Sequence, residues 1–137
     1  MAQINPHVLF KENTEEAFNF YKSVFGGGFT MLVRIKDLPN DPNNPISEND
    51  GNKITHIALP IGKSTVLMAS DVAKQFMDQE LVRGNRHTIS ISTDSKEEAN
   101  KLFNGLSAGG EIEMPITDST WVPIFECLMT SLVYNGW

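Results

Sequence analysis

The sequence predicts an α+β fold built from two similar modules, each consisting of a strand, a helix and three further strands. Two observations support this prediction: each of two amphipathic helices lies between β-prone segments, and a repeat relates the two. The halves match at an offset of 82 residues, so that Glu15-Glu16-Ala17 falls on Glu97-Glu98-Ala99. Capping residues and glycine stops are widespread, so two unrelated amphipathic helices are the alternative.

The first module is expected at about residues 4–71. Asn13 or Thr14 can cap its helix, and Gly26-Gly27-Gly28 ends it where the backbone needs positive φ. A polar loop over 37–52 and a tight hairpin at Gly62-Lys63 complete the connections. The strands are expected at His7–Phe10, Phe29–Lys36, Lys53–Ile61 and Ser64–Ser70. The apolar stripe of the helix consists of Ala17, Phe20, Tyr21, Val24 and Phe25.

A linker over 72–85 is expected to lead to the second module, residues 86–137. Asp94 or Ser95 can cap its helix, and Gly109-Gly110 ends it. Its strands are expected at His87–Thr93, at Glu111–Thr117 and twice within Trp121–Trp137. The helix stripe consists of Ala99, Leu102, Phe103 and Leu106.

Composition excludes several classes of function. The chain has 137 residues, the size of one domain, and a net charge of -6, which disfavours nucleic-acid binding. It has no apolar stretch of the roughly 20 residues that a membrane span needs, and its start lacks the blocks of a signal peptide. A single cysteine, Cys127, allows no internal disulfide. We therefore expect a soluble, cytoplasmic protein.

Several stretches of the chain together match one protein family. They are Asn13–Gly27, His56 with Leu59-Pro60-Ile61-Gly62, Leu67–Asp71, Leu102–Asn104 through Gly109-Gly110, and Met114-Pro115. With these motifs the chain resembles the vicinal oxygen chelate superfamily (glyoxalase I, bleomycin-resistance proteins and extradiol dioxygenases), and within it the PhnB-like branch. The resemblance implies a single domain, 1–137, whose two βαβββ modules form an eight-stranded curled mixed sheet around a cleft, with the helices outside. It also implies a homodimer that binds a small molecule.

The superfamily's metal enzymes hold their ion with one residue on each of four strands. The resemblance places these positions at Pro6, Met68, Thr88 and near Trp137. None of these side chains suits a hard or borderline divalent ion, so we expect no metal cofactor. His7 and His87 each lie one residue from such a position, and strand alternation groups them with Leu9 and Ile89, toward the helices. Packed or partly exposed histidines are therefore favoured over a His7–His87 metal pair.

The remaining cleft face is expected to consist of Val8, Arg34, His56, Met68, Thr88 and Ser90. Arg34 and His56 are its candidate polar anchors. His56 is also the candidate general acid or base, because imidazole titrates near neutrality. The alternative is a half-buried strand histidine with one hydrogen bond, since the sequence places no carboxylate beside it.

The leading function is therefore the binding of an unidentified small molecule in the cleft, without the superfamily metal. One alternative is a metal-dependent lyase, isomerase or dioxygenase of glyoxalase type; another is a drug-sequestering dimer of resistance type. Many relatives carry labels such as 3-demethylubiquinone methyltransferase. The sequence offers no methyl-donor site, because it has no glycine-rich turn after a first strand followed by an acidic residue on a second.

The tail, residues 122–137, departs from the family's usual continuation. The loss of one base from the gene would explain this departure. If one G is restored before a permitted codon string for these residues, the shifted reading frame encodes Gly-Ser-Tyr-Phe-Arg-Met-Phe-Asp-Asp-Lys-Phe-Gly-Val-Gln-Trp-Met. This sequence fits the family along its length. We therefore predict a frame-shifted reading here, which the gene sequence tests. The alternative is a divergent tail that still forms the last two strands, because Ile124-Phe125 and Leu132-Val133-Tyr134 are β-prone.

Overall fold

The computed structural model describes residues 1–43, 45–73, 80–82, 89–108 and 126–129. The chain divides into two compact units, Met1–Val82 and Arg83–Trp137. The α+β class is confirmed: the described residues hold six strands, in one sheet of four and one of two. The eight-stranded sheet stays a prediction. In the described ranges no helix combines the length and apolar character needed to cross a membrane.

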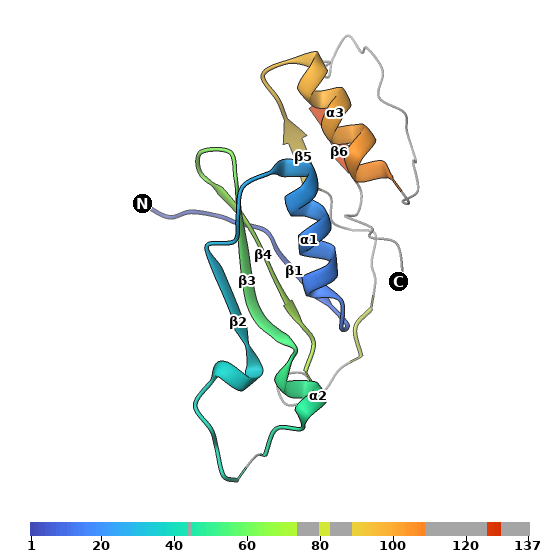
Figure 1. Ribbon diagram of the computed structural model, residues 1–137. Coiled ribbons are helices and arrows are strands. Elements are labelled where there is room, and N and C mark those ends of the chain that lie inside the picture. Colours follow the sequence, from blue (N-terminus) through green and yellow to red (C-terminus); the bar gives the residue numbers. More distant parts are fainter. Residues whose placement is uncertain (44, 74–79, 83–88, 109–125, 130–137) are drawn as a thin grey trace. The chain divides into compact units, whose positions relative to one another are not determined.

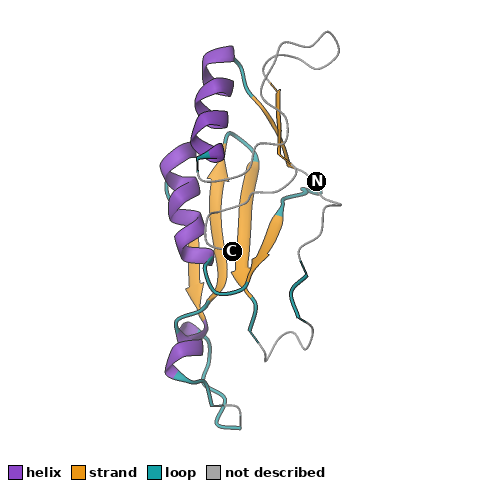
Figure 2. Ribbon diagram, turned by 90° about the vertical axis from the view of Figure 1, so that its right-hand side faces the viewer, coloured by secondary structure: helices purple, strands orange, loops and turns teal. Residues whose placement is uncertain are grey.

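The first unit is a complete strand–helix–strand–strand–strand module, in which helix α1 (Thr14–Phe25) lies against one face of a four-stranded sheet (Figures 1 and 2). The strands are β1 (His7–Phe10), β2 (Met31–Arg34), β3 (Ile54–Ile61) and β4 (Thr65–Asp71), in the order β1-β4-β3-β2. β1 runs parallel to β4, and the other neighbours are antiparallel. The sheet is therefore mixed, as expected.

The core of this unit lies between α1 and the sheet. Ala17, Phe18 and Tyr21 of α1 are buried there, and the Phe18 ring meets Phe10 of β1 edge to face with centroids 6.3 Å apart. The predicted stripe omitted Phe18, which takes the central place, whereas its Phe20 is only half-buried, as are Val24 and Phe25. Both choices satisfy helical spacing, and the position of Phe10 decides between them.

The first turn of α1 is held by a residue distant in sequence. Asn13 occupies the N-cap position, but its side chain makes no capping bond. Instead the Thr14 N–H and hydroxyl both donate to Oδ1 of Asp71, at 3.1 and 2.7 Å. A carboxylate at a helix start satisfies unpaired N–H groups and suits the helix dipole. Gly26 ends the helix with φ +80°, as predicted.

Strand β2 is shorter than predicted, because the chain turns after Arg34 into a single 3-10 turn, η1 (Ile35–Asp37). Asp37 Oδ2 accepts the Arg34 N–H at 3.0 Å, and the turn brings Ile35 into the core. The polar loop that follows contains one short helix, α2 (Glu48–Gly51), which the sequence did not predict. The β3–β4 hairpin is confirmed, with Gly62 at φ +66°.

The second unit repeats the start of the first. Its described elements are β5 (Ile89–Ser92), α3 (Lys96–Ser107), and β6 (Glu126–Met129), which pairs antiparallel with β5. The bounds of β5 and α3 equal those of β1 and α1 shifted by 82 residues. Ser95 caps α3, as predicted, by accepting the Glu98 N–H at 3.2 Å.

Several predictions fall outside the described residues. These are the linker over 74–79 and 83–85, the start of the strand at His87–Thr93, the stop at Gly109-Gly110, the strand Glu111–Thr117 and most of the tail. The second βαβββ module therefore stays a prediction beyond β5 and α3. β6 lies inside the tail, and the gene sequence remains the test of its reading frame.

Candidate functional site

The two faces of the four-stranded sheet carry different chemistry. One face meets α1, and its central residues Ile57, Leu59 and Ala69 are fully buried. Side chains alternate along each strand, so the residues between these belong to the opposite face. We call this opposite face the histidine face; it consists of His7, Leu9, Met31, Val33, His56, Ala58, Met68 and Ser70.

Two imidazoles and one hydroxyl meet on the histidine face. His7 Nε2 lies 3.1 Å from Ser70 Oγ, and the rings of His7 and His56 lie 6.0 Å apart with an interplanar angle of 62°. In the part of the chain that the structure describes, the His56 ring contacts His7 but makes no hydrogen bond. The three side chains come from three strands, β1, β3 and β4. The sheet register therefore assembles them.

The environment of this cluster favours the neutral form of His7. Desolvation by burial, and then the nearby charge of His56, lower the pKa of the His7 imidazole below its ordinary value of 6.5. A neutral imidazole can either donate to or accept from the Ser70 hydroxyl, depending on its tautomer. The His7–Ser70 pair can thus present either a donor or an acceptor to a ligand.

Apolar side chains surround the cluster. Across the sheet, His7 is paired with Met68, Met68 with Ala58, and Ala58 with Met31. In the next row, Leu9 is paired with Ser70 and Val33 with His56. Met31 is half exposed, at 50%, so this surface is accessible at its β2 edge. A few polar groups among apolar side chains are typical of small-molecule sites.

The expected cleft residues do not share one face. His56 and Met68 lie on the histidine face, but Val8 and Arg34 lie on the α1 face, which corrects the prediction. Ser90 belongs to the second unit, where it is exposed and alternates with half-buried Ile89 and Ile91. Thr88 lies outside the described residues, as do His87 and Trp137.

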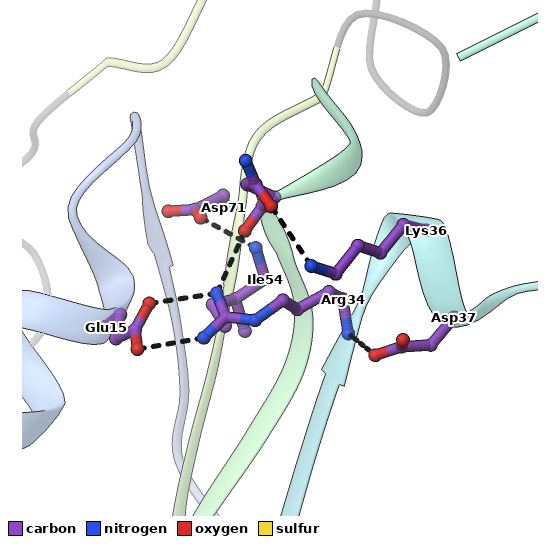
Figure 3. A network of polar contacts seen from close by, with 7 residues as sticks. Glu15, Arg34, Lys36, Asp37, Ile54 and Asp71 are labelled. Carbon is purple, nitrogen blue, oxygen red and sulfur yellow. Dashed lines mark hydrogen bonds and ion pairs between the residues drawn. The ribbon is translucent and has the colours of Figure 1, made fainter. Parts of the chain in front are cut away.

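Arg34 is held by its own module rather than free to anchor a ligand. Its guanidinium donates to both carboxylate oxygens of Glu15 on α1, at 2.8 and 2.9 Å, and to the backbone carbonyl of Asn52 at 3.0 Å (Figure 3). This contact raises the pKa of Arg34 and lowers that of Glu15, chiefly through the shared hydrogen bonds. Arg34 therefore joins β2 to α1.

A polar hollow of about 600 Å³ lies beside this ion pair. It is lined by Glu12, Glu15, Arg34, Lys36, Asp50, Asn52 and Lys53, among others. Its charges largely satisfy one another, because Arg34 pairs with Glu15 and Lys53 pairs with Asp50 at 3.2 Å. This arrangement explains how the loop 37–52 is fastened, and it leaves the histidine face as the better candidate site.

The position of His7 corrects a second prediction. Alternation grouped His7 with Leu9 correctly, but placed both toward the helices. Instead Phe10 enters the core, so Val8 and Phe10 face α1 while His7 and Leu9 face away. The β1 residue opposite Met68 is consequently His7, not Pro6, whose carbonyl accepts the Met68 N–H at 3.0 Å.

The donor set of the histidine face can be tested against a metal. Catalytic zinc sites use three protein ligands, commonly histidine and carboxylate. His7 and His56 supply two imidazoles, and nowhere in the described ranges do three His, Cys, Asp or Glu residues converge as a metal site. The donors present there do not fit the superfamily metal. The expected metal positions at Thr88 and near Trp137 fall outside those ranges.

Sequence reasoning did not place His7 and Ser70 on this face with His56. The motif Ser70-Asp71 ends β4, and its two side chains point to opposite faces, one to the histidine cluster and one to α1. One signal was available in β4, where Leu67, Ala69 and Asp71 alternate with Met68 and Ser70 and therefore point to the other face. Placing His7 beside Ser70 also requires the orientation of β1. The sequence of the four-residue strand β1 does not show which of its two faces points toward the helix.

The βαβββ module with polar groups on the sheet face opposite its helix defines a class of protein, and comparison with known families agrees. Residues 3–127 match the model of the Glyoxalase/Bleomycin resistance protein/Dioxygenase superfamily. The chain belongs to this superfamily.

Two solved structures are similar to the chain. Protein PA1353 from Pseudomonas aeruginosa is 33% identical, with a TM-score of 0.70 and coverage of 88% of this chain and 84% of that one. A PhnB protein from Bacillus cereus, which carries a 3-demethylubiquinone-9 3-methyltransferase name, is 21% identical, with a TM-score of 0.64 and the same coverages of 88% and 84%. The second likeness concerns the fold alone. A search of curated proteins finds no match.

Proposed function

We propose that the protein binds a small organic molecule on the histidine face, without a metal ion. The observation that carries this proposal is the meeting of His7, His56 and Ser70 on one sheet face amid apolar side chains. Apolar surface supplies affinity by removing area from water, and the three polar groups orient the ligand. Whether a reaction follows binding depends on the ligand, and His56 with His7 is the candidate acid–base pair.

A thermal-shift screen of the full chain against small molecules tests this proposal. A ligand that binds only the folded state at 100 times its Kd adds about 2.7 kcal/mol of stability, which raises the melting temperature by several degrees. The screen is run with a chelator and again with Zn²⁺, Ni²⁺ or Mn²⁺. Hits that appear only with metal would contradict the metal-free proposal and favour the glyoxalase-type alternative.

Two adjacent residues of β2 provide a matched pair of variants. Met31 lies on the histidine face and Leu32 on the α1 face, and their exposed fractions are 50% and 38%. We expect Met31→Ala and His56→Ala to weaken binding of each hit, while Leu32→Ala leaves it unchanged. Hits that respond equally to both β2 variants would place the site elsewhere.

We further propose that the protein acts as a cytoplasmic homodimer without nucleic-acid or membrane partners. The superfamily resemblance supports the dimer, and the net charge of -6 supports the absence of nucleic acid. Light scattering after size exclusion tests the dimer, and a monomeric mass at micromolar concentration would contradict it. A drug that binds only the dimer would instead favour the sequestering alternative.

A further inference from the structure

The histidine face is free of fixed charge in the strands that form it. β1, β2, β3 and β4 contain two charged residues, Arg34 and Asp71, and both lie on the α1 face. The titratable groups that these strands present on the histidine face are therefore His7 and His56, with Ser70 as the neighbouring hydroxyl. The chain has a net charge of -6, but the titratable groups of this face are imidazoles, which gain positive charge when they are protonated.

Hydrogen-bond directions on this face favour an acceptor as the ligand group. When His7 is protonated, Nε2 can only donate, so Ser70 Oγ accepts that bond and its own hydrogen is free to donate elsewhere. The His56 ring adds a second nitrogen donor. The ring separation of 6.0 Å is short enough for the oxygens of one oxyanion to reach both rings at ordinary hydrogen-bond distances.

We propose that His7, His56 and Ser70 bind an oxyanion group, such as a carboxylate or a phosphate, of the small molecule. This proposal rests on the function proposed above and names the chemical class of its ligand. Apolar neighbours such as Met68 and Val33 reduce the local dielectric, which strengthens the attraction between an imidazolium and an anion. The same neighbours would accommodate an apolar body attached to the anion.

Binding of an anion is coupled to proton uptake. In the free protein two effects oppose protonation of His7: desolvation by burial and, after it, the nearby charge of His56, whose ring lies 6.0 Å away. A bound oxyanion removes this penalty, so protons are taken up on binding. Each proton taken up makes the affinity increase up to tenfold for each pH unit of acidification. The affinity for an anion should therefore rise as the pH falls from 7.5 to 5.5.

Benzoate and benzamide test the proposal, because the two molecules share a shape and differ in charge. Binding of each to the full chain is measured by calorimetry at pH 7.5 and 5.5, at one ionic strength since salt screens charge. We expect benzoate to bind at least tenfold more tightly than benzamide at pH 5.5. We also expect the affinity for benzoate to be at least tenfold lower at pH 7.5 than at pH 5.5. Circular dichroism at both values confirms that the chain is folded.

Two variants and a matched control locate the effect. We expect Ser70→Ala and His56→Gln to reduce the preference for benzoate to below threefold. Ser23→Ala removes an exposed hydroxyl on α1 that bonds only to the neighbouring Phe20 carbonyl, and it should retain the full preference. A parallel readout is the imidazole ¹⁵N chemical shift of His7, whose titration should move to higher pH when benzoate is bound.

The possible outcomes separate this inference from the proposed function. Equal binding of benzoate and benzamide, lost in Met31→Ala, would overturn the anion site while supporting a small-molecule site on the histidine face. A benzoate preference that Ser70→Ala and His56→Gln leave intact would overturn the assignment of residues. Absence of binding by benzoate overturns this inference, and absence of any hit in the screen overturns the proposed function as well.

Discussion

Asp71 is predicted to be the polar residue whose loss most destabilises the first unit. Its side chain is 8% exposed and accepts three hydrogen bonds: two from Thr14 at the start of α1 and one from the Ile54 N–H of β3 at 2.8 Å. One carboxylate on β4 therefore joins a helix start to a neighbouring strand. Thr14 and Ile54 are themselves buried, so water cannot replace the lost acceptor without opening the structure.

The magnitude follows from the donors that Asp71→Ala would leave unpaired. Each buried polar group without a partner costs about 1–3 kcal/mol, and two of the three donors are backbone N–H groups that cannot turn away. We therefore expect Asp71→Ala to lower the free energy of unfolding by about 3–5 kcal/mol. Asp71→Asn keeps one acceptor oxygen for Thr14 but turns an amide N–H toward Ile54, so we expect a loss of about 2–3 kcal/mol.

Urea unfolding followed by far-ultraviolet circular dichroism measures both variants, with the m-value as a check that the same transition is observed. Asp41→Ala is the matched control, because Asp41 is exposed and accepts one backbone N–H from Asn43 within its loop. That control should cost less than about 1 kcal/mol. If Asp71→Ala costs no more than Asp41→Ala, the capping role assigned to Asp71 is wrong.

Three further predictions concern acid stability, the ion pair and the helix caps. Burial lowers the pKa of His7 below its ordinary value of 6.5. The contribution of neutral His7 to stability is therefore complete above about pH 6.5 and is lost as the pH falls through the folded-state pKa. The melting temperature of the wild type should fall over this range, and that of His7→Gln should fall less. The Arg34–Glu15 pair is partly exposed, so a double-mutant cycle should give a coupling of about 1 kcal/mol or less that decreases with salt, and Arg34→Ala should leave ligand binding unchanged. Ser95→Ala should cost about 1 kcal/mol because the hydroxyl caps α3, whereas Asn13→Ala should cost a few tenths at most; equal losses in urea unfolding would contradict the assigned caps.

The two faces of the sheet explain why the candidate site was only partly predictable. His56 and Met68 were predicted to share a face, and they do, because β3 and β4 carry enough apolar residues to show their alternation. β1 has four residues, and both of its faces carry an apolar side chain: Val8 with Phe10 on one, and Leu9 with His7 on the other. The contact between Phe10 and Phe18 selects the first, and no local pattern reveals that contact.

Arg34 illustrates a different limit. Its place within a strand was predicted, but its partner was not, because Glu15 lies 19 residues earlier on a helix. With no partner nearby in the sequence, Arg34 was predicted to be available for a ligand. Once the helix packs on the sheet, both terminal nitrogens of the guanidinium donate hydrogen bonds to the Glu15 carboxylate.

The sequence by itself determined the local elements and their repetition. Helical spacing, capping residues and glycine stops placed α1 and α3 at an offset of 82 residues, because these signals act within a few turns of chain. Only the tertiary structure decided which face each strand presents and which distant groups meet. The Asp71 cap, the Arg34–Glu15 pair and the cluster of His7, Ser70 and His56 all join separate elements. Such contacts depend on strand register and on how the helix packs, and both are set by burial of the whole core rather than by any local segment.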